Sequence, residues 1–121
     1  MPPVVLVSEY AGSDGSLIRH AVDDGAKGLV IDGVGAGNVN AQTYQAIKYA
    51  LGKNIPVVVT SSVPRGSVYP AYGGEGGGAT MQSDGVIMGS DLGAAKARLL
   101  LMLGIPYAKG DKNKLGALFA R

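Results

Sequence analysis

The chain has 121 residues, a formal net charge of +2 and no cysteine. This length is that of one domain, residues 1–121, and is enough to bury a sizeable core. The weak charge predicts no nucleic-acid partner, and the lack of cysteine excludes disulfides and thiolate metal sites. No apolar run approaches the roughly 20 residues that span a bilayer, and we see no signal peptide, so we expect a globular domain without a membrane partner.

The N-terminal half predicts two strand–helix units. Val4–Val7 is a short apolar run typical of a strand buried on both faces. A helical pattern over Leu17–Val22 follows, and Gly25 is its expected end. A second buried strand over Gly28–Ile31 stops at Asp32-Gly33. After a glycine-rich turn, a second helix is expected over Tyr44–Gly52.

The C-terminal half continues the alternation. Ile55–Val59 and Gly85–Met88 have the apolar, β-branched composition of strands. An apolar helix is expected from its cap Asp91 to Leu103, and Gly104 and Pro106 are expected to end it.

Four strands that alternate with helices predict an α/β fold. We expect three layers, with a four-stranded parallel sheet that carries helices on both faces, as in flavodoxin- and Rossmann-like proteins. Right-handed crossovers leave few strand orders, and we predict the flavodoxin-like order 2-1-3-4. Ligands of such sheets bind beyond the carboxyl ends of the strands, so the loops at that edge are the candidate site.

The loop Gly33–Asn38 follows a strand and opens a helix, as a dinucleotide-binding loop would. Its glycines fall at every second residue and do not match G-x-G-x-x-G, and no acidic residue ends the next strand at Val59-Thr60-Ser61. Nucleotide binding is therefore a minor alternative. Asn38 fits two roles, the N-cap of the following helix or an amide that offers a donor and an acceptor to a ligand.

Glu75 lies between two glycines and three glycines. It is either an ordinary solvated carboxylate or a charge that a glycine-rich loop brings to a ligand, for which an α-amino group is the natural partner. The only histidine, His20, has no histidine or acidic partner nearby in the sequence, so we expect it on a helix surface. The residues alone predict no catalytic set, no metal site and no cofactor.

Several stretches, in order and together, resemble the second domain of bacterial type II L-asparaginases: Tyr10-Ala11, Asp24–Val30, Gly33–Asn38, Val57–Gly66, Asp91-Leu92 and Lys96–Leu103. The resemblance covers nearly the whole chain. One departure is Ser62, which stands where the family usually has arginine. Serine cannot replace the planar set of donors of a guanidinium group.

The resemblance implies that the chain is the C-terminal domain of an enzyme that hydrolyses L-asparagine to L-aspartate and ammonia. In that family the nucleophilic threonine and its activating aspartate–lysine pair lie in an N-terminal domain, whose motifs this chain lacks. The implied substrate-binding residues are Asn38 and Glu75, which would reach the active site of a neighbouring subunit in a homo-oligomer. No catalytic residue, cofactor or metal is implied here, and the chain alone is expected to be inactive. A non-catalytic folding or dimerisation module is the alternative.

Overall fold

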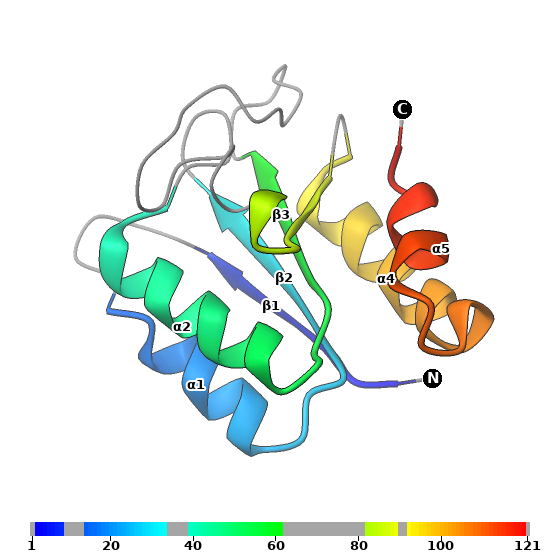
Figure 1. Cartoon of the computed structure of the whole chain (residues 1–121). Helices are drawn as coiled ribbons and strands as arrows, with labels where there is room; N and C mark the ends of the chain where they lie inside the picture. Colours follow the sequence, from blue (N-terminus) through cyan, green and yellow to red (C-terminus); the bar gives the residue numbers. More distant parts are fainter. Residues whose placement is uncertain (1, 9–13, 34–38, 62–81, 90–91, 121) are drawn as a thin grey trace.

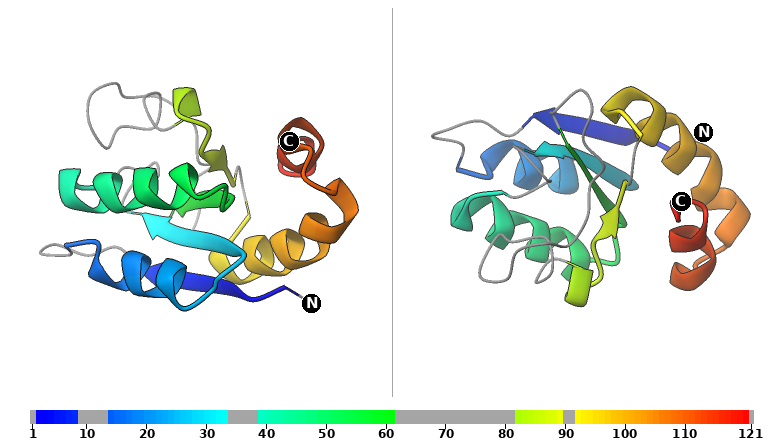
Figure 2. Two further views of the ribbon diagram at one scale, coloured as in Figure 1. Left: turned by 60° about the horizontal axis from the view of Figure 1, so that its bottom comes forward. Right: turned by 90° about the horizontal axis from the view of Figure 1, so that it is seen from above.

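The computed structural model describes residues 2–8, 14–33, 39–61, 82–89 and 92–120. In chain order its strands and helices are β1 (Val4–Ser8), α1 (Ser16–Asp23), β2 (Gly28–Gly33), α2 (Ala41–Gly52), β3 (Val57–Ser61), β4 (Ile87–Met88), α4 (Ala94–Ala108) and α5 (Lys112–Ala117). The strands pair in parallel in one sheet. Helices α1 and α2 cover one face, and α4 and α5 cover the other, which confirms the predicted three-layer α/β fold (Figures 1 and 2).

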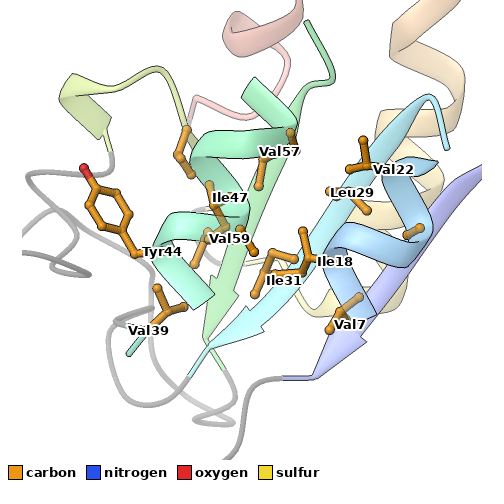
Figure 3. Close-up of a cluster of buried hydrophobic side chains, with 14 of the residues drawn as sticks. Val7, Ile18, Val22, Leu29, Ile31, Val39, Tyr44, Ile47, Val57 and Val59 are labelled. Atoms are coloured by element: carbon orange, nitrogen blue, oxygen red, sulfur yellow. The ribbon is translucent and has the colours of Figure 1, made fainter. Parts of the chain in front are cut away.

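The inner strands β2 and β3 carry the core. Every side chain of Leu29–Ile31 and Val57–Val59 is fully buried. Successive side chains of a strand point to opposite faces, so the two strands feed two clusters. Leu29, Ile31, Val57 and Val59 pack under α1 and α2 (Figure 3), whereas Val30 and Val58 pack under α4 and α5. The continuous apolar runs follow from this double burial.

The strand order is β1-β2-β3-β4, so the predicted order 2-1-3-4 is wrong. The cause is the placement of the helices. Right-handed crossovers that keep moving in one direction leave their helices on one face, and a reversal of the order puts them on opposite faces. Because α1 and α2 lie on the same face and pack on each other, the order runs on without reversal (Figure 1).

Strand β1 lies at one edge of the described sheet, and the prediction that it is buried on both faces holds only in part. Val4 and Val7 are buried, but Leu6 is 40% exposed. Helix α4 reaches this edge, where the Nε of Arg98 donates a hydrogen bond of 2.8 Å to the carbonyl oxygen of Val4. An apolar run cannot distinguish an edge strand from an inner one, because burial on the second face depends on neighbours distant in sequence.

Helix α4 continues through Gly104 and Pro106 to Ala108, beyond the predicted end at Leu103. Tertiary packing explains why the glycine does not stop it. A Cβ at Gly104 would lie 2.8 Å from a methyl carbon of Leu115 and 2.9 Å from one of Leu118, so the missing side chain makes room for the segment that packs on α4. The local helix-ending preference of glycine is weaker than this packing.

The remaining boundaries differ in smaller ways. The third strand begins two residues after the predicted Ile55, and only Ile87 and Met88 of the predicted fourth strand pair in the sheet. The N-cap of α4 is Gly93; the predicted cap, Asp91, lies outside the described residues. None of the described helices has the length and apolar composition needed to cross a membrane.

Two contacts fix the ends of α1. The backbone N–H of Ser16 donates to Asp14, and this hydrogen bond lowers the pKa of the Asp14 carboxyl below its usual value. At the other end Gly25, with φ of 95°, donates its N–H to the carbonyl of Val22, which confirms the predicted helix end. Asp23 accepts a 2.7 Å hydrogen bond from the hydroxyl of Tyr49 in α2, and this bond raises the pKa of that phenol.

The start of α1 lies against the backbone of α2 at Gly15. This residue has φ of 81°, and a Cβ there would lie 2.7 Å from the Cβ of Ala46 and 2.9 Å from the carbonyl oxygen of Gln42. Glycine is therefore required twice at this position, by the left-handed backbone and by the close approach of the two helices.

We expect Gly15→Ala to lower the free energy of unfolding by about 2–4 kcal/mol, because it combines left-handed strain with a clash against α2. Gly25→Ala is the matched control, since Gly25 also has positive φ but no atom within 4 Å of an added Cβ. It should cost only about 1–2 kcal/mol. Urea denaturation of the two variants measures the difference. Equal losses would contradict the role given to the helix contact.

Candidate functional site

The carboxyl ends of β1, β2 and β3 meet at one edge of the sheet, because the three strands are parallel. The register places Ser8 beside Asp32 and Asp32 beside Thr60. We call Ser8, Asp32 and Thr60 the edge row. Alternation along β2 and β3 turns the last two side chains to the face that α4 covers, two residues beyond Val30 and Val58. The edge row thus borders the core cluster that contains Val30 and Val58, and its side chains are polar.

Thr60 and Asp32 are joined within this row. The Oγ1 of Thr60 donates a hydrogen bond to Oδ1 of Asp32 across 3.2 Å. Thr60 is fully buried and Asp32 is half-buried. Within the described residues this carboxylate has no ion-pair partner. One oxygen of the Asp32 carboxylate therefore accepts a hydrogen bond from Thr60. In the described part of the domain, no positively charged side chain pairs with this carboxylate.

Gly89 completes this arrangement on the side of β4. Its N–H donates to the carbonyl of Val59 across 2.9 Å, which extends the pairing of β3 and β4 by one residue. A Cβ at Gly89 would lie 2.8 Å from the Cγ2 of Thr60. The absence of a side chain there leaves room for the Thr60 methyl group and so for the rotamer that points the hydroxyl at Asp32.

The N-cap of α2 is Asn40, not Asn38 as one interpretation of the sequence had it. The side chain of Asn40 accepts a 2.8 Å hydrogen bond from the N–H of Thr43. That contact requires the acceptor three residues before the donor, and Asn40 meets this spacing. Asn38 itself lies outside the described residues. The side chain that caps α2 is therefore that of Asn40. The other role expected for Asn38, an amide that binds a ligand, stays a prediction.

Glu75 and Ser62 also lie outside the described residues. The chain becomes described again at residue 82, and here the hydroxyl of Tyr44 donates a hydrogen bond to the carboxylate of Asp84. Tyr44 is buried in α2, and the Nζ of Lys48 lies 5.2 Å from the centre of its ring. The hydrogen bond between Tyr44 and Asp84 links the segment that leads into β4 to α2, on the face of the sheet opposite α4.

The position of His20 agrees with its prediction. His20 is exposed on α1, as expected for a surface histidine. Among the described residues, no group of three or more histidine, cysteine, aspartate or glutamate side chains could hold a metal ion. Because Thr60 is fully buried, its hydroxyl cannot reach a substrate carbonyl as a nucleophile would. Thr60 is therefore unsuited to attack on a bond.

Sequence reasoning did not single out Asp32 or Thr60 as site residues. Both were placed at strand ends, but a link between them needs the register of two strands that lie 28 residues apart. The sequence did contain an indication, since each of the two is the first polar residue after a run of buried apolar residues. Polar residues at such positions of neighbouring parallel strands are expected to meet at the ligand edge. The Tyr44–Asp84 contact has no comparable signal.

Comparisons with known proteins cover almost the whole chain. The sequence model of the glutaminase/asparaginase C-terminal domain family matches residues 3–119. An L-asparaginase of Bacillus licheniformis is 37% identical over 115 residues, which are 94% of this chain and 36% of that protein. A glutamyl-tRNA(Gln) amidotransferase polypeptide of Methanobrevibacter smithii is 33% identical over 117 residues, which are 93% of this chain and 24% of that polypeptide.

A solved structure supports the same relationship. The crystal structure of a probable cytoplasmic L-asparaginase from Campylobacter jejuni matches with a TM-score of 0.85 and 30% sequence identity. The match covers 98% of this chain and 35% of that chain. This chain therefore spans about a third of the length of the L-asparaginases that it matches, and less of the amidotransferase polypeptide.

We expect a double-mutant cycle with Thr60→Val and Asp32→Ala to give a coupling energy of about 0.5–1.5 kcal/mol in the free energy of unfolding, because each change removes one partner of the same hydrogen bond. Thr60→Ser paired with Asp32→Ala is the control: serine keeps the hydroxyl and its hydrogen bond, so the two changes should be additive and the coupling energy of this cycle should be near zero. Urea denaturation of the chain measures both cycles. Additive effects of Thr60→Val and Asp32→Ala would show that the contact does not stabilise the fold.

Proposed function

Since this chain belongs to the glutaminase/asparaginase C-terminal domain family, we propose that it works as the C-terminal domain of an L-asparaginase, which hydrolyses L-asparagine to L-aspartate and ammonia. The observation that carries the proposal is the match over residues 3–119. It is supported by a structural match of 0.85 in TM-score that covers nearly all of the chain.

In this proposal the chain positions the substrate and contributes contacts between subunits, and another domain breaks the bond. Hydrolysis of an amide through a covalent intermediate requires an activated nucleophile and donors for the oxyanion. The threonine of the edge row is fully buried and hydrogen-bonded to Asp32, so it is unsuited to that role. The relatives have about two thirds of their length outside the match, where such groups have room.

Asn38 and Glu75 are the proposed substrate-binding residues, directed at the α-amino end of L-asparagine. Asn38 follows β2 by five residues and directly precedes Val39, which is buried against α2. Glu75 belongs to the segment that joins β3 to β4. Both segments start from the carboxyl ends of strands, where ligands of parallel sheets bind. The proposed partner is a second copy of the protein, whose active site these two side chains would complete.

The purified chain is expected to release no ammonia from L-asparagine, because the domain lacks the nucleophile. Addition of the part of the Bacillus licheniformis L-asparaginase that this chain does not match, in trans or as a fusion, should produce ammonia from L-asparagine. A coupled assay for ammonia measures both. Release of ammonia by the chain alone would contradict the proposal that another domain carries the nucleophile. Binding or dimer formation without turnover in any combination would favour a non-catalytic module.

In the assembled enzyme, Asn38→Ala and Glu75→Gln should each lower kcat/KM for L-asparagine about tenfold or more, because a polar contact to the charged end of the substrate is lost. Steady-state kinetics measures the effect. Asn113→Ala and Asp24→Asn are matched controls, since both residues are exposed, Asn113 in α5 and Asp24 directly after α1, and neither follows the carboxyl end of a strand. If all four variants behave like the parent enzyme, the two residues do not bind substrate.

A further inference from the structure

We propose that Asp32 is a further substrate-binding residue of this domain, whose carboxylate receives the α-ammonium group of the amino-acid substrate while Thr60 holds it in position. The inference rests on the proposed function, because it takes the substrate to be an amino-acid amide. It adds to Asn38 and Glu75 a residue that the resemblance to the L-asparaginases does not name.

The first argument is the place of Asp32 in the sheet. It is the last residue but one of β2, an inner strand with β1 on one side and β3 on the other. Ligands of open parallel sheets bind just beyond the carboxyl ends of such strands. Asp32 is also half-buried, so its carboxylate stands at the boundary between the core and the ligand edge.

The second argument is charge. Partial burial weakens the hydration of a carboxylate, and this cost is offset when a cation or hydrogen-bond donors take the place of water. Thr60 supplies one neutral donor, to Oδ1. Within the described residues no lysine, arginine or histidine forms an ion pair with Asp32. An ammonium group, with three donors and a positive charge, matches what this carboxylate still lacks there.

The third argument is preorganisation. Thr60 is β-branched and fully buried, and its methyl group fits against the bare backbone of Gly89. Such a side chain has little rotational freedom, so the direction of its hydroxyl is fixed. Because Oδ1 of Asp32 accepts from a donor that is fixed in place, the other oxygen, Oδ2, also keeps a constant direction. This is how a supporting residue keeps a binding group in the geometry that a ligand needs.

A metal ion fits the same place less well. Calcium takes six to eight oxygen ligands, and magnesium binds through carboxylates together with waters or phosphates in an octahedral arrangement. The edge row offers one carboxylate, and the described part of the chain has no group of three or more metal-binding side chains. A single carboxylate with one supporting hydroxyl is enough for an ammonium group.

The test compares two substrates in the assembled enzyme, L-asparagine and succinamate. Succinamate has the same amide and the same carboxylate but no ammonium group. Asp32→Asn keeps the shape of the side chain and removes its charge. We expect it to raise KM for L-asparagine about tenfold or more with kcat nearly unchanged, and to leave KM for succinamate within about twofold of the parent value.

Thr60 is tested as a positioning residue. Thr60→Val should raise KM for L-asparagine in the same direction by a smaller factor, and Thr60→Ser, which restores the hydroxyl, should bring KM back toward the parent value. Asp24→Asn is the matched control and should change neither substrate, because Asp24 is exposed at the end of α1. If Asp32→Asn affects both substrates equally, Asp32 acts on the fold or on assembly, and the inference is wrong.

A second measurement separates this inference from the proposed function. If the assembled enzyme releases no ammonia from L-asparagine, the proposed function fails, and ligand binding to the same assembly decides on Asp32. In a nuclear magnetic resonance titration of this assembly, L-asparagine should then shift the amide signals of Asp32 and Thr60 while succinamate does not, and Asp32→Asn should abolish the shift. The absence of any shift in the parent assembly would overturn the inference.

Discussion

The burial of β2 and β3 on both faces is the constraint on which the rest of the domain depends. The paired side chains of Leu29–Ile31 and Val57–Val59 are withdrawn from water, and their alternation requires apolar partners above and below the sheet. Helices α1 and α2 satisfy one face, and α4 with α5 satisfies the other. Polar side chains are excluded from the middle of these strands, so the first place that admits them is the carboxyl edge, where Asp32 and Thr60 stand.

The uninterrupted strand order bears on how such an edge can bind a ligand. Doubly wound sheets form a crevice where the strand order reverses and neighbouring loops diverge to opposite faces. The sheet described here, β1-β2-β3-β4, has no reversal. The described strands therefore form no such crevice at the edge row, and in the proposed function groups of another domain and of a second copy complete the site there. The chain spans about a third of the length of the L-asparaginases that it matches.

The fold class followed from the sequence because continuous apolar runs and helical periodicity report local environment directly. The errors came where distant contacts decide. Leu6 is exposed because the helices leave part of β1 uncovered at this edge of the described sheet, and Gly104 lies inside a helix because Leu115 packs against it. The N-cap of α2 is Asn40, whereas one interpretation of the sequence gave this role to Asn38. Both asparagines are good capping residues, and only the position at which the helix begins selects one. The pairing of Asp32 likewise depends on the register between strands, which no local pattern contains.

The hydrogen bond from Arg98 to the carbonyl of Val4 has a consequence for how copies of this domain can associate. An edge strand with free backbone groups is a template onto which a foreign strand can add, and exposed edges of this kind lead to aggregation. Here a guanidinium group occupies one of the acceptors of β1 and brings a positive charge to the rim of the sheet. A strand approaching there would have to displace it. The hydrogen bond of Arg98 thereby opposes the addition of a foreign strand at this edge of the sheet.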